Sequence, residues 1–121
     1  MEDGRPLFVQ IAEEVESAVL EGSLAEGERA PSTNELAVFH RINPATAAKG
    51  INLLVDRQIL IKRRGLGMFV AEGAQETLRG QRRQRFADHY LTPLLAEARH
   101  IGLSTETVIE LLRERAQQIP K

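Results

Sequence analysis

Three short groups of polar and basic residues have the types and spacing that contact with double-stranded DNA requires. They lie in the segments 32–34, 41–49 and 62–67. Arg and Lys neutralise phosphates, short polar side chains reach base edges in the major groove, and glycine lets the backbone approach the duplex closely. The candidate DNA-contacting residues are Ser32, Thr33, Asn34, Arg41, Asn43, Pro44, Ala45, Thr46, Lys49, Lys62, Arg63, Arg64, Gly65 and Gly67.

Two helices are predicted to carry the first two groups. Ser32, with Glu35 three residues later, predicts a capping box at the start of a short helix that ends near His40. Asn43 as the N-cap and Pro44 at the first helical position predict the start of the next helix. The residues expected to be buried are Leu36, Ala37 and Phe39 in the former helix and Ile51, Leu54 and Val55 in the latter.

A β-hairpin is predicted to carry the third group. Residues 58–62 and 68–70 have β-forming side chains, and Gly65-Leu66-Gly67 supplies the turn between them. An earlier helix, residues 6–21, has apolar residues every four positions and is expected to support the DNA-contacting unit. The sequence therefore predicts a winged helix-turn-helix DNA-binding domain over residues 1–73.

Residues 74–121 are predicted to form a helical region that dimerises. Pro93 lies inside a helical stretch, 78–100, and predicts a kink or break near residues 89–93, while 102–104 should end one helix and cap the next. Two such helices leave an apolar seam that must pack on another chain. The seam residues are Phe86, Tyr90, Leu91, Leu94, Leu95, Val108, Leu111 and Leu112. The predicted fold class is mainly α with a small β-wing (α+β), an N-terminal winged helix-turn-helix followed by a C-terminal two-helix dimerisation region.

The composition agrees with a DNA-binding protein only when the distribution of charge is considered. The 121 residues carry a formal net charge of −1, yet six Lys or Arg and a single acid lie between residues 41 and 64. Positive charge is thus concentrated where a winged helix contacts phosphate. No apolar run approaches the ~18 residues of a membrane span, and the acidic, polar start is unlike a signal peptide, so we expect a cytoplasmic protein with no membrane partner.

Other kinds of chemistry find no support in the sequence. Without cysteine there are no disulfides and no thiolate metal sites. The three histidines, His40, His89 and His100, are widely spaced and lack a metal-binding pattern. There is no P-loop, nucleophile elbow or paired-carboxylate motif. We therefore expect no enzyme activity, no catalytic residue, no bound metal and no cofactor.

The segments PSTNELA, RINPATAAKGINLLVDRQIL and KRRGLGMFV, in this order, resemble the GntR family of bacterial transcription regulators. The short C-terminal region, together with residues 42–46, resembles the YtrA-like subfamily. The resemblance implies a homodimeric repressor that binds a palindromic DNA operator and is released by a small-molecule effector of unknown identity. With 48 residues after Gly73, an effector site is expected at the dimer interface, near Phe86, Tyr90 and Leu94. Two positions depart from the family pattern: Asn34 stands where many members have Arg, and Arg41 where the turn often has Gly.

Several alternatives stay open on the sequence alone. The winged helix could be a protein–protein interaction module that does not read DNA, and Lys62-Arg63-Arg64 could be a solvated strand edge. A second basic cluster, formed by Arg79, Arg82, Arg83 and Arg85, is more typical of a solvated helix face than of a DNA site. The stripe Phe86, Tyr90 and Leu94 could line a ligand pocket rather than a packing seam.

Overall fold

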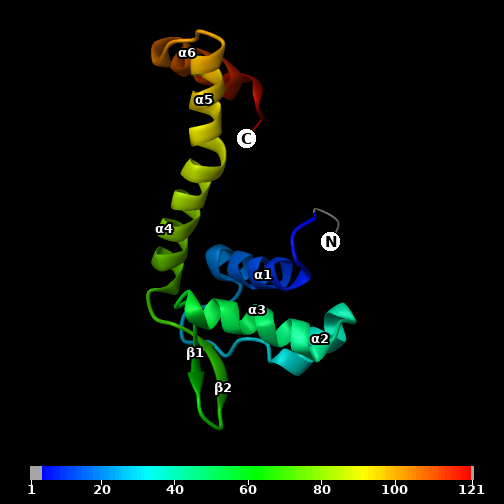
Figure 1. The fold of residues 1–121 in the computed structure, drawn as a ribbon. Helices are drawn as coiled ribbons and strands as arrows, with labels where there is room; N and C mark the ends of the chain where they lie inside the picture. Colours follow the sequence, from blue (N-terminus) through cyan, green and yellow to red (C-terminus); the bar gives the residue numbers. More distant parts are fainter. Residues whose placement is uncertain (1–3, 121) are drawn as a thin grey trace. The chain divides into compact units, whose positions relative to one another are not determined.

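The structure, a computed structural model, describes residues 4–120. It divides into two compact units, one ending at Gln81 and the other beginning at Arg82. In chain order the elements are α1 (Leu7–Glu21), α2 (Thr33–His40), α3 (Pro44–Asp56), β1 (Leu60–Arg63), β2 (Gly67–Val70), α4 (Ala74–Phe86), the π-helix η1 (Ala87–Leu91), α5 (Thr92–His100) and α6 (Thr105–Gln118) (Figure 1). The predicted fold class, a winged helix-turn-helix followed by a helical region, is confirmed. The division predicted between residues 73 and 74 stays a prediction.

The core of the first unit forms where α1 packs on α3. Ile11 and Val15 of α1 and Ile51 and Leu54 of α3 are buried there. Gly50 lets the two backbones approach, because a Cβ at this position would lie 2.9 Å from the carbonyl oxygen of Phe8. Any larger residue would push α3 away from α1, so the close packing of the two helices depends on the absence of a side chain at Gly50.

A buried ion pair joins α1 to the end of α3. Glu16 is fully buried, and its Oε2 accepts a hydrogen bond from Nη1 of Arg57 at 3.0 Å. Arg57 is the C-cap residue of α3, and Gln58 after it has a positive φ of 66°. The N–H of Ile59 then donates to the carbonyl of Leu54 at 2.9 Å, and the chain enters β1. The ion pair therefore lies where the helix-turn-helix ends and the hairpin begins.

Local caps define α2 and α3. The hydroxyl of Ser32 accepts the Glu35 N–H at 3.0 Å, and the Glu35 carboxylate accepts the Ser32 N–H at 3.1 Å, so the predicted capping box is confirmed. Asn43 Oδ1 accepts the Ala45 N–H at 2.8 Å, which confirms Asn43 as an N-cap.

The predicted burial of Phe39 is wrong. Its side chain is 77% exposed, whereas Leu36 and Ala37 are buried. At 100° per residue, Phe39 lies roughly 110° around the helix from the centre of the face that those two residues form. A helix as short as α2 has only that narrow buried face.

The hairpin of β1 and β2 is the wing. Its register pairs Leu60 with Val70 and Arg63 with Gly67, and the N–H of Leu66 donates to the carbonyl of Arg63 across the turn. The segment 28–30 lies along the other edge of β2, with Ala30 N–H donating to the Met68 carbonyl at 2.8 Å and an isolated bridge between Arg29 and Phe69. The wing therefore has a third, short strand-like edge that precedes α2.

The second unit contains η1, α5 and α6. The N–H of Thr92 bonds to the carbonyl of Ala87, five residues earlier, while the backbone stays helical through Leu91 and Thr92. The disturbance predicted near Pro93 is thus a π-helical turn, which accommodates a residue that cannot donate an α-helical hydrogen bond. The hydroxyl of Ser104 accepts the Thr107 N–H at 3.1 Å and caps α6, as predicted. No helix within residues 4–120 combines the length and apolar character needed to cross a membrane.

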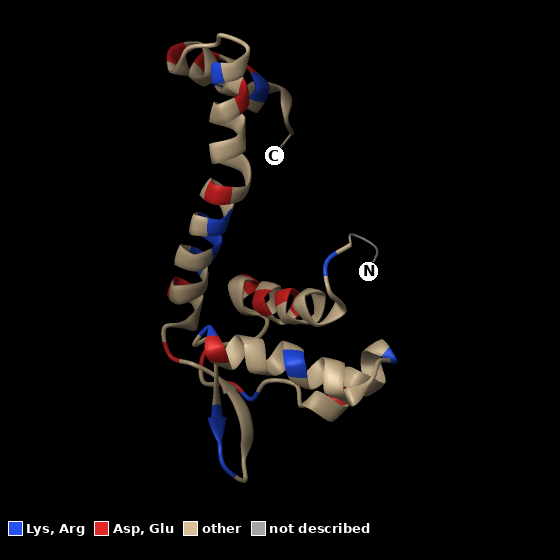
Figure 2. Cartoon of the chain, viewed as in Figure 1, with Lys and Arg blue, Asp and Glu red and all other residues tan. Residues whose placement is uncertain are grey.

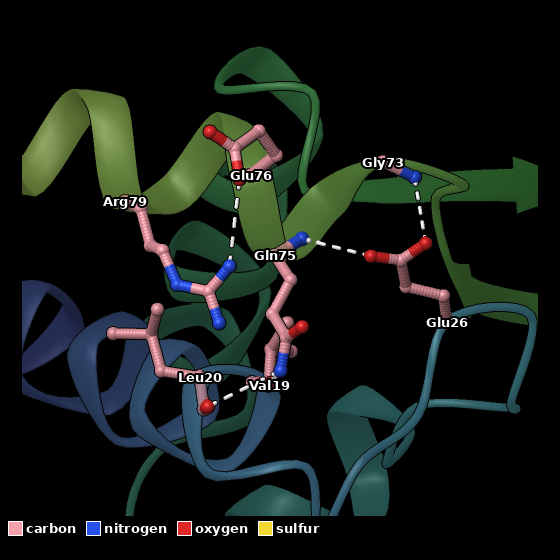
Figure 3. Close-up of polar contacts among 7 residues, drawn as sticks. All are labelled: Val19, Leu20, Glu26, Gly73, Gln75, Glu76 and Arg79. Carbon is pink, nitrogen blue, oxygen red and sulfur yellow. Dashed lines mark hydrogen bonds and ion pairs between the residues drawn. The ribbon is translucent and has the colours of Figure 1, made fainter.

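The start of α4 is held by side chains from the first unit (Figure 3). The two carboxylate oxygens of Glu26 accept the N–H of Gly73 at 2.8 Å and the N–H of Gln75 at 3.1 Å. The amide of Gln75 in turn donates to the carbonyls of Val19 and Leu20 at the end of α1, each at 3.2 Å. Ala74 and Leu78 are buried in the same core cluster as α1 and α3, so the first turns of α4 belong to that core.

Replacing Glu26 by Gln is expected to loosen the start of α4. The N–H of Gly73, followed by that of Gln75, holds the pKa of the Glu26 carboxyl below its ordinary value. A depressed folded-state pKa means that the contribution to stability is present above the unfolded-state pKa and is lost as pH falls through the folded-state pKa. Glu26→Gln should therefore lower Tm at neutral pH, and the difference from wild type should shrink as the solution is acidified. Thermal melts over a pH series measure this.

The matched control is Glu72→Gln, which removes an exposed carboxylate from the same stretch of chain. It should leave Tm unchanged. Hydrogen exchange of the Gly73 and Gln75 amides should accelerate in Glu26→Gln only. Equal exchange rates in both variants would show that Glu26 is not the cap.

Candidate nucleic-acid interface

The start of α2 and the turn after it lie at the surface. Thr33 is half-buried and Asn34 is exposed beside the capping Ser32. The N–H of Ser32, followed by its hydroxyl and by the charge of Arg29, lowers the pKa of Glu35, so the capping carboxylate stays ionised. After α2, Arg41 adopts the left-handed conformation, with φ 55° and ψ 50°, although it carries a side chain. The turn therefore presents a cation from a strained backbone position.

The first turns of α3 present short side chains and one long cation. Asn43, Pro44 and Ala45 are exposed, and Thr46 is half-buried next to them. Because Oδ1 of Asn43 is used by the cap, its NH₂ group is left as the donor. The Nζ of Lys49 lies 5.3 Å from the ring centroid of Phe8, a cation–π contact that leans the side chain toward α1. The short side chains at the start of α3 allow this face to approach a base edge closely, and Lys49 lies at the border of the face.

The wing presents its basic residues at the surface. Lys62, Arg63, Arg64 and Gly65 are exposed, and the guanidinium of Arg63 lies 4.9 Å from the ring centroid of Phe69. Gly67 has a φ of 116°, and a Cβ on it would lie 3.1 Å from Nε of Arg29. Reasoning from sequence missed Arg29, because this residue lies in a loop segment whose pairing with β2 depends on a partner about forty positions further along the chain.

Charge is divided between the elements of the first unit. Figure 2 shows Lys and Arg on β1 and the wing tip, and Asp and Glu along α1. Exposed cations thus lie on the wing, at Lys49 and at Arg41, while α1 carries four acids, Glu13, Glu14, Glu16 and Glu21. A concentrated basic surface of this kind attracts the DNA backbone in spite of a near-zero net charge.

A comparison with known families decides what this arrangement is. Residues 7–70 match the model described as "Bacterial regulatory proteins, gntR family". The chain belongs to the GntR family. It is accordingly a DNA-binding transcriptional regulator and not an enzyme, and the interaction module that does not read DNA is the less supported alternative.

Individual relatives agree with the GntR assignment. The chain is 28% identical to the HTH-type transcriptional repressor YtrA of Bacillus subtilis, over 90% of this chain and 83% of YtrA. The structure of a GntR-family protein from Bacteroides thetaiotaomicron is similar with a TM-score of 0.80, 26% identity, and coverage of 93% of this chain and 97% of that one. BusR of S. agalactiae, solved in complex with its busAB promoter DNA, is similar with a TM-score of 0.59 and 25% identity over 91% of this chain and 53% of BusR.

The apolar seam predicted for the C-terminal region of this GntR protein is largely accessible in the single chain. Tyr90 is 60% exposed and Leu94 is half-buried, whereas Val108 is buried. The other seam residues, Phe86, Leu91, Leu95, Leu111 and Leu112, are exposed. Within residues 4–120 no three His, Asp or Glu side chains are grouped as metal ligands would be.

Arg41 should contribute to DNA binding at a cost in stability. Arg41→Gly is expected to raise the free energy of unfolding by up to about 1 kcal/mol, because glycine adopts the left-handed conformation without strain but loses more chain entropy. It should also weaken DNA binding, since one cation is lost. Denaturant unfolding and fluorescence anisotropy with duplex DNA measure the two effects.

Gln58→Gly is the matched control, because Gln58 is the other non-glycine residue with positive φ among residues 4–120. It should give a similar gain in stability with unchanged DNA affinity. If Arg41→Gly also keeps wild-type affinity, Arg41 makes no contact with DNA.

Proposed function

We propose that this GntR regulator is a homodimeric repressor that binds a palindromic operator with α3 in the major groove and the wing on the flanking backbone. The observation that carries the proposal is the exposed face of α3, which combines short side chains at Ala45 and Thr46 with a cation, Lys49, at its border. A side chain that is short does not hold the helix away from the base edges. Similarity to the repressor YtrA supports repression rather than activation.

The proposed contacts divide into two kinds. Asn43, Ala45 and Thr46 face the base edges, where Asn can donate to an acceptor and the methyl group of Ala or Thr can pack on a thymine methyl. The remaining polar and basic candidates, from the start of α2, the turn and the wing, contact phosphates and fix the register of the protein on the duplex. They are Ser32, Thr33, Asn34, Arg41, Lys49, Lys62, Arg63 and Arg64.

Dimerisation is proposed to use the apolar seam of η1, α5 and α6. Large side chains such as Tyr90, Leu95 and Leu112 are exposed in the single chain, and burying them against a second copy removes apolar surface from water. A two-fold dimer places two copies of α3 at half-sites about 34–36 Å apart, or a multiple of this. Because its operator would lie on chromosomal DNA, we propose that this regulator is cytoplasmic.

A small-molecule effector is proposed to bind at the same interface, near Phe86, Tyr90 and Leu94. The two aromatic rings lie 5.6 Å apart and could stack on or enclose an apolar ligand once a second copy closes the site. Ligand screening by thermal shift, on the full chain and on a variant that stays monomeric, tests the proposal. A ligand that raises the Tm of the monomer as much as that of the dimer would place the site elsewhere.

Thr46 and Arg64 should affect DNA binding in different ways. Thr46→Ala is expected to relax the choice of sequence, with a loss of roughly 1–3 kcal/mol on the operator only. Arg64→Ala is expected to weaken binding to all sequences and to lower the salt slope by about 0.9, the contribution of one phosphate contact. Fluorescence anisotropy at several salt concentrations, with DNA from upstream of the gene and a scrambled duplex, separates the two outcomes.

An unchanged salt slope for Arg64→Ala would show that the wing does not contact DNA phosphates. Equal weakening on both duplexes for Thr46→Ala would mean that Thr46 does not read bases. Equal, weak binding of the wild type to both duplexes would point to an operator elsewhere or to the interaction module.

A charge introduced into the seam should dissociate the dimer. Leu95→Asp and Leu112→Asp change exposed side chains, so each should leave the folded chain intact while a buried carboxylate at the interface becomes costly. Sedimentation equilibrium should show a shift toward monomer. Ala96→Asp is the control, because Ala96 is an exposed residue of α5 outside the seam. If Leu95→Asp and Leu112→Asp remain as dimeric as wild type, another surface mediates assembly.

A further inference from the structure

We propose that Arg29 is a further DNA-contacting residue, which forms with Arg63 a pair of guanidinium groups that binds backbone phosphate on one face of the wing. The proposal rests on the binding mode proposed above, in which the wing lies on the DNA backbone. It concerns a residue outside the helix-turn-helix and outside the hairpin itself.

Geometry places the two side chains on the same face. Arg63 pairs with Gly67 in the β1–β2 register, and paired residues of antiparallel strands direct their side chains to one side of the sheet. The guanidinium of Arg29 occupies the space over Gly67, since a Cβ there would lie 3.1 Å from its Nε and 3.6 Å from its Nη2. The absence of a side chain at Gly67 is what leaves room for Arg29 beside Arg63.

The backbone holds Arg29 at this place. Its bridge to Phe69 and the hydrogen bond from Ala30 to the Met68 carbonyl align the segment with β2. Arg63 is positioned from the other strand by its contact with the Phe69 ring, at 4.9 Å. Both cations are thus anchored on Phe69, one through the backbone and one through the ring, which lowers the entropy lost when they bind an anion.

The charge of Arg29 acts on the Glu35 carboxyl without forming an ion pair with it. Among residues 4–120, no carboxylate forms an ion pair with Arg29 or Arg63, in contrast to Arg57, which pairs with Glu16. Two guanidinium groups on one small face repel each other unless an anion lies between or above them. Guanidinium binds carboxylate and phosphate oxygens through two parallel hydrogen bonds, so a backbone phosphate of DNA is an anion that this arrangement can bind.

Arg29 also connects the wing with α2. It lies three residues before Ser32, and its charge contributes to lowering the pKa of Glu35 at the start of α2. A phosphate bound at Arg29 would therefore lie close both to the wing and to the N-terminus of α2, where the helix dipole favours negative charge.

The test compares two substitutions on the full chain. Arg29→Gln removes the charge but keeps a long stem over Gly67, and Arg29→Lys keeps the charge but loses the planar fork. In fluorescence anisotropy with the upstream and scrambled duplexes, Arg29→Gln should lower the salt slope by about 0.9 on both. Arg29→Lys should keep the slope and lose only part of the affinity. Arg113→Gln, which removes an exposed cation from α6, is the control and should match wild type.

The outcomes distinguish a failure of the Arg29 contact from a failure of the proposed binding mode. An unchanged slope for Arg29→Gln overturns the contact, provided that the wild type binds DNA with a measurable slope. Equal loss of affinity for both variants, without a change in slope, would show that Arg29 only shapes the wing and also overturns it. If the wild type itself shows no salt-dependent binding, the proposed binding mode fails together with the role of Arg29. Circular dichroism melts of both variants establish that they are folded.

Discussion

The arrangement of the DNA-binding unit depends on one buried carboxylate. Glu16 is fully buried, and an ionised carboxylate is tolerated there because Arg57 donates to it at 3.0 Å. Removing one partner of a buried pair costs about 3–5 kcal/mol of stability. Loss of either Glu16 or Arg57 would therefore destabilise the folded unit strongly. Arg57 ends α3, and its carbonyl accepts the side-chain amide of Gln81 from α4 at 3.0 Å. The end of α3, the entry to the wing and the side of α4 all meet at this residue.

Separation of charge explains how a chain with a net charge of −1 can serve as a DNA-binding protein. At physiological salt an exposed charge acts over about 8 Å, so a phosphate on the wing senses the nearby arginines and little of α1. The acids are used for structure: Glu16 pairs with Arg57, Glu35 caps α2 and Glu26 caps α4. The charge of Glu16 is neutralised by its guanidinium partner, so Glu16 adds little to the field at the wing.

The features that the sequence predicted well are those determined within a few residues. The capping box of Ser32 and Glu35 and the cap at Asn43 are local, and the glycine turn of the wing follows from neighbouring residues. Features that join distant segments escaped prediction, such as Arg29 over Gly67. The burial predicted for Phe39 is wrong because the apolar character of a residue does not give the orientation of α2 on the core. At Pro93 the place of the disturbance followed from the residue type, but its form, a π-helical turn, depends on the carbonyl that accepts the Thr92 N–H.

The capping of α4 by Glu26 has a consequence for the order of folding. The carboxylate and the N–H that it accepts are 47 residues apart in the chain, so α4 cannot be capped before the segment around Glu26 has taken its place. During synthesis the N-terminal segment leaves the ribosome first, and domains generally form in that order. Within the first unit, however, Glu26 is positioned only once β2 has formed, because the N–H of Gly27 donates to the carbonyl of Val70 at 2.8 Å. Capping of α4 by Glu26 is thus a late step, which requires the wing to have paired with the segment that precedes α2.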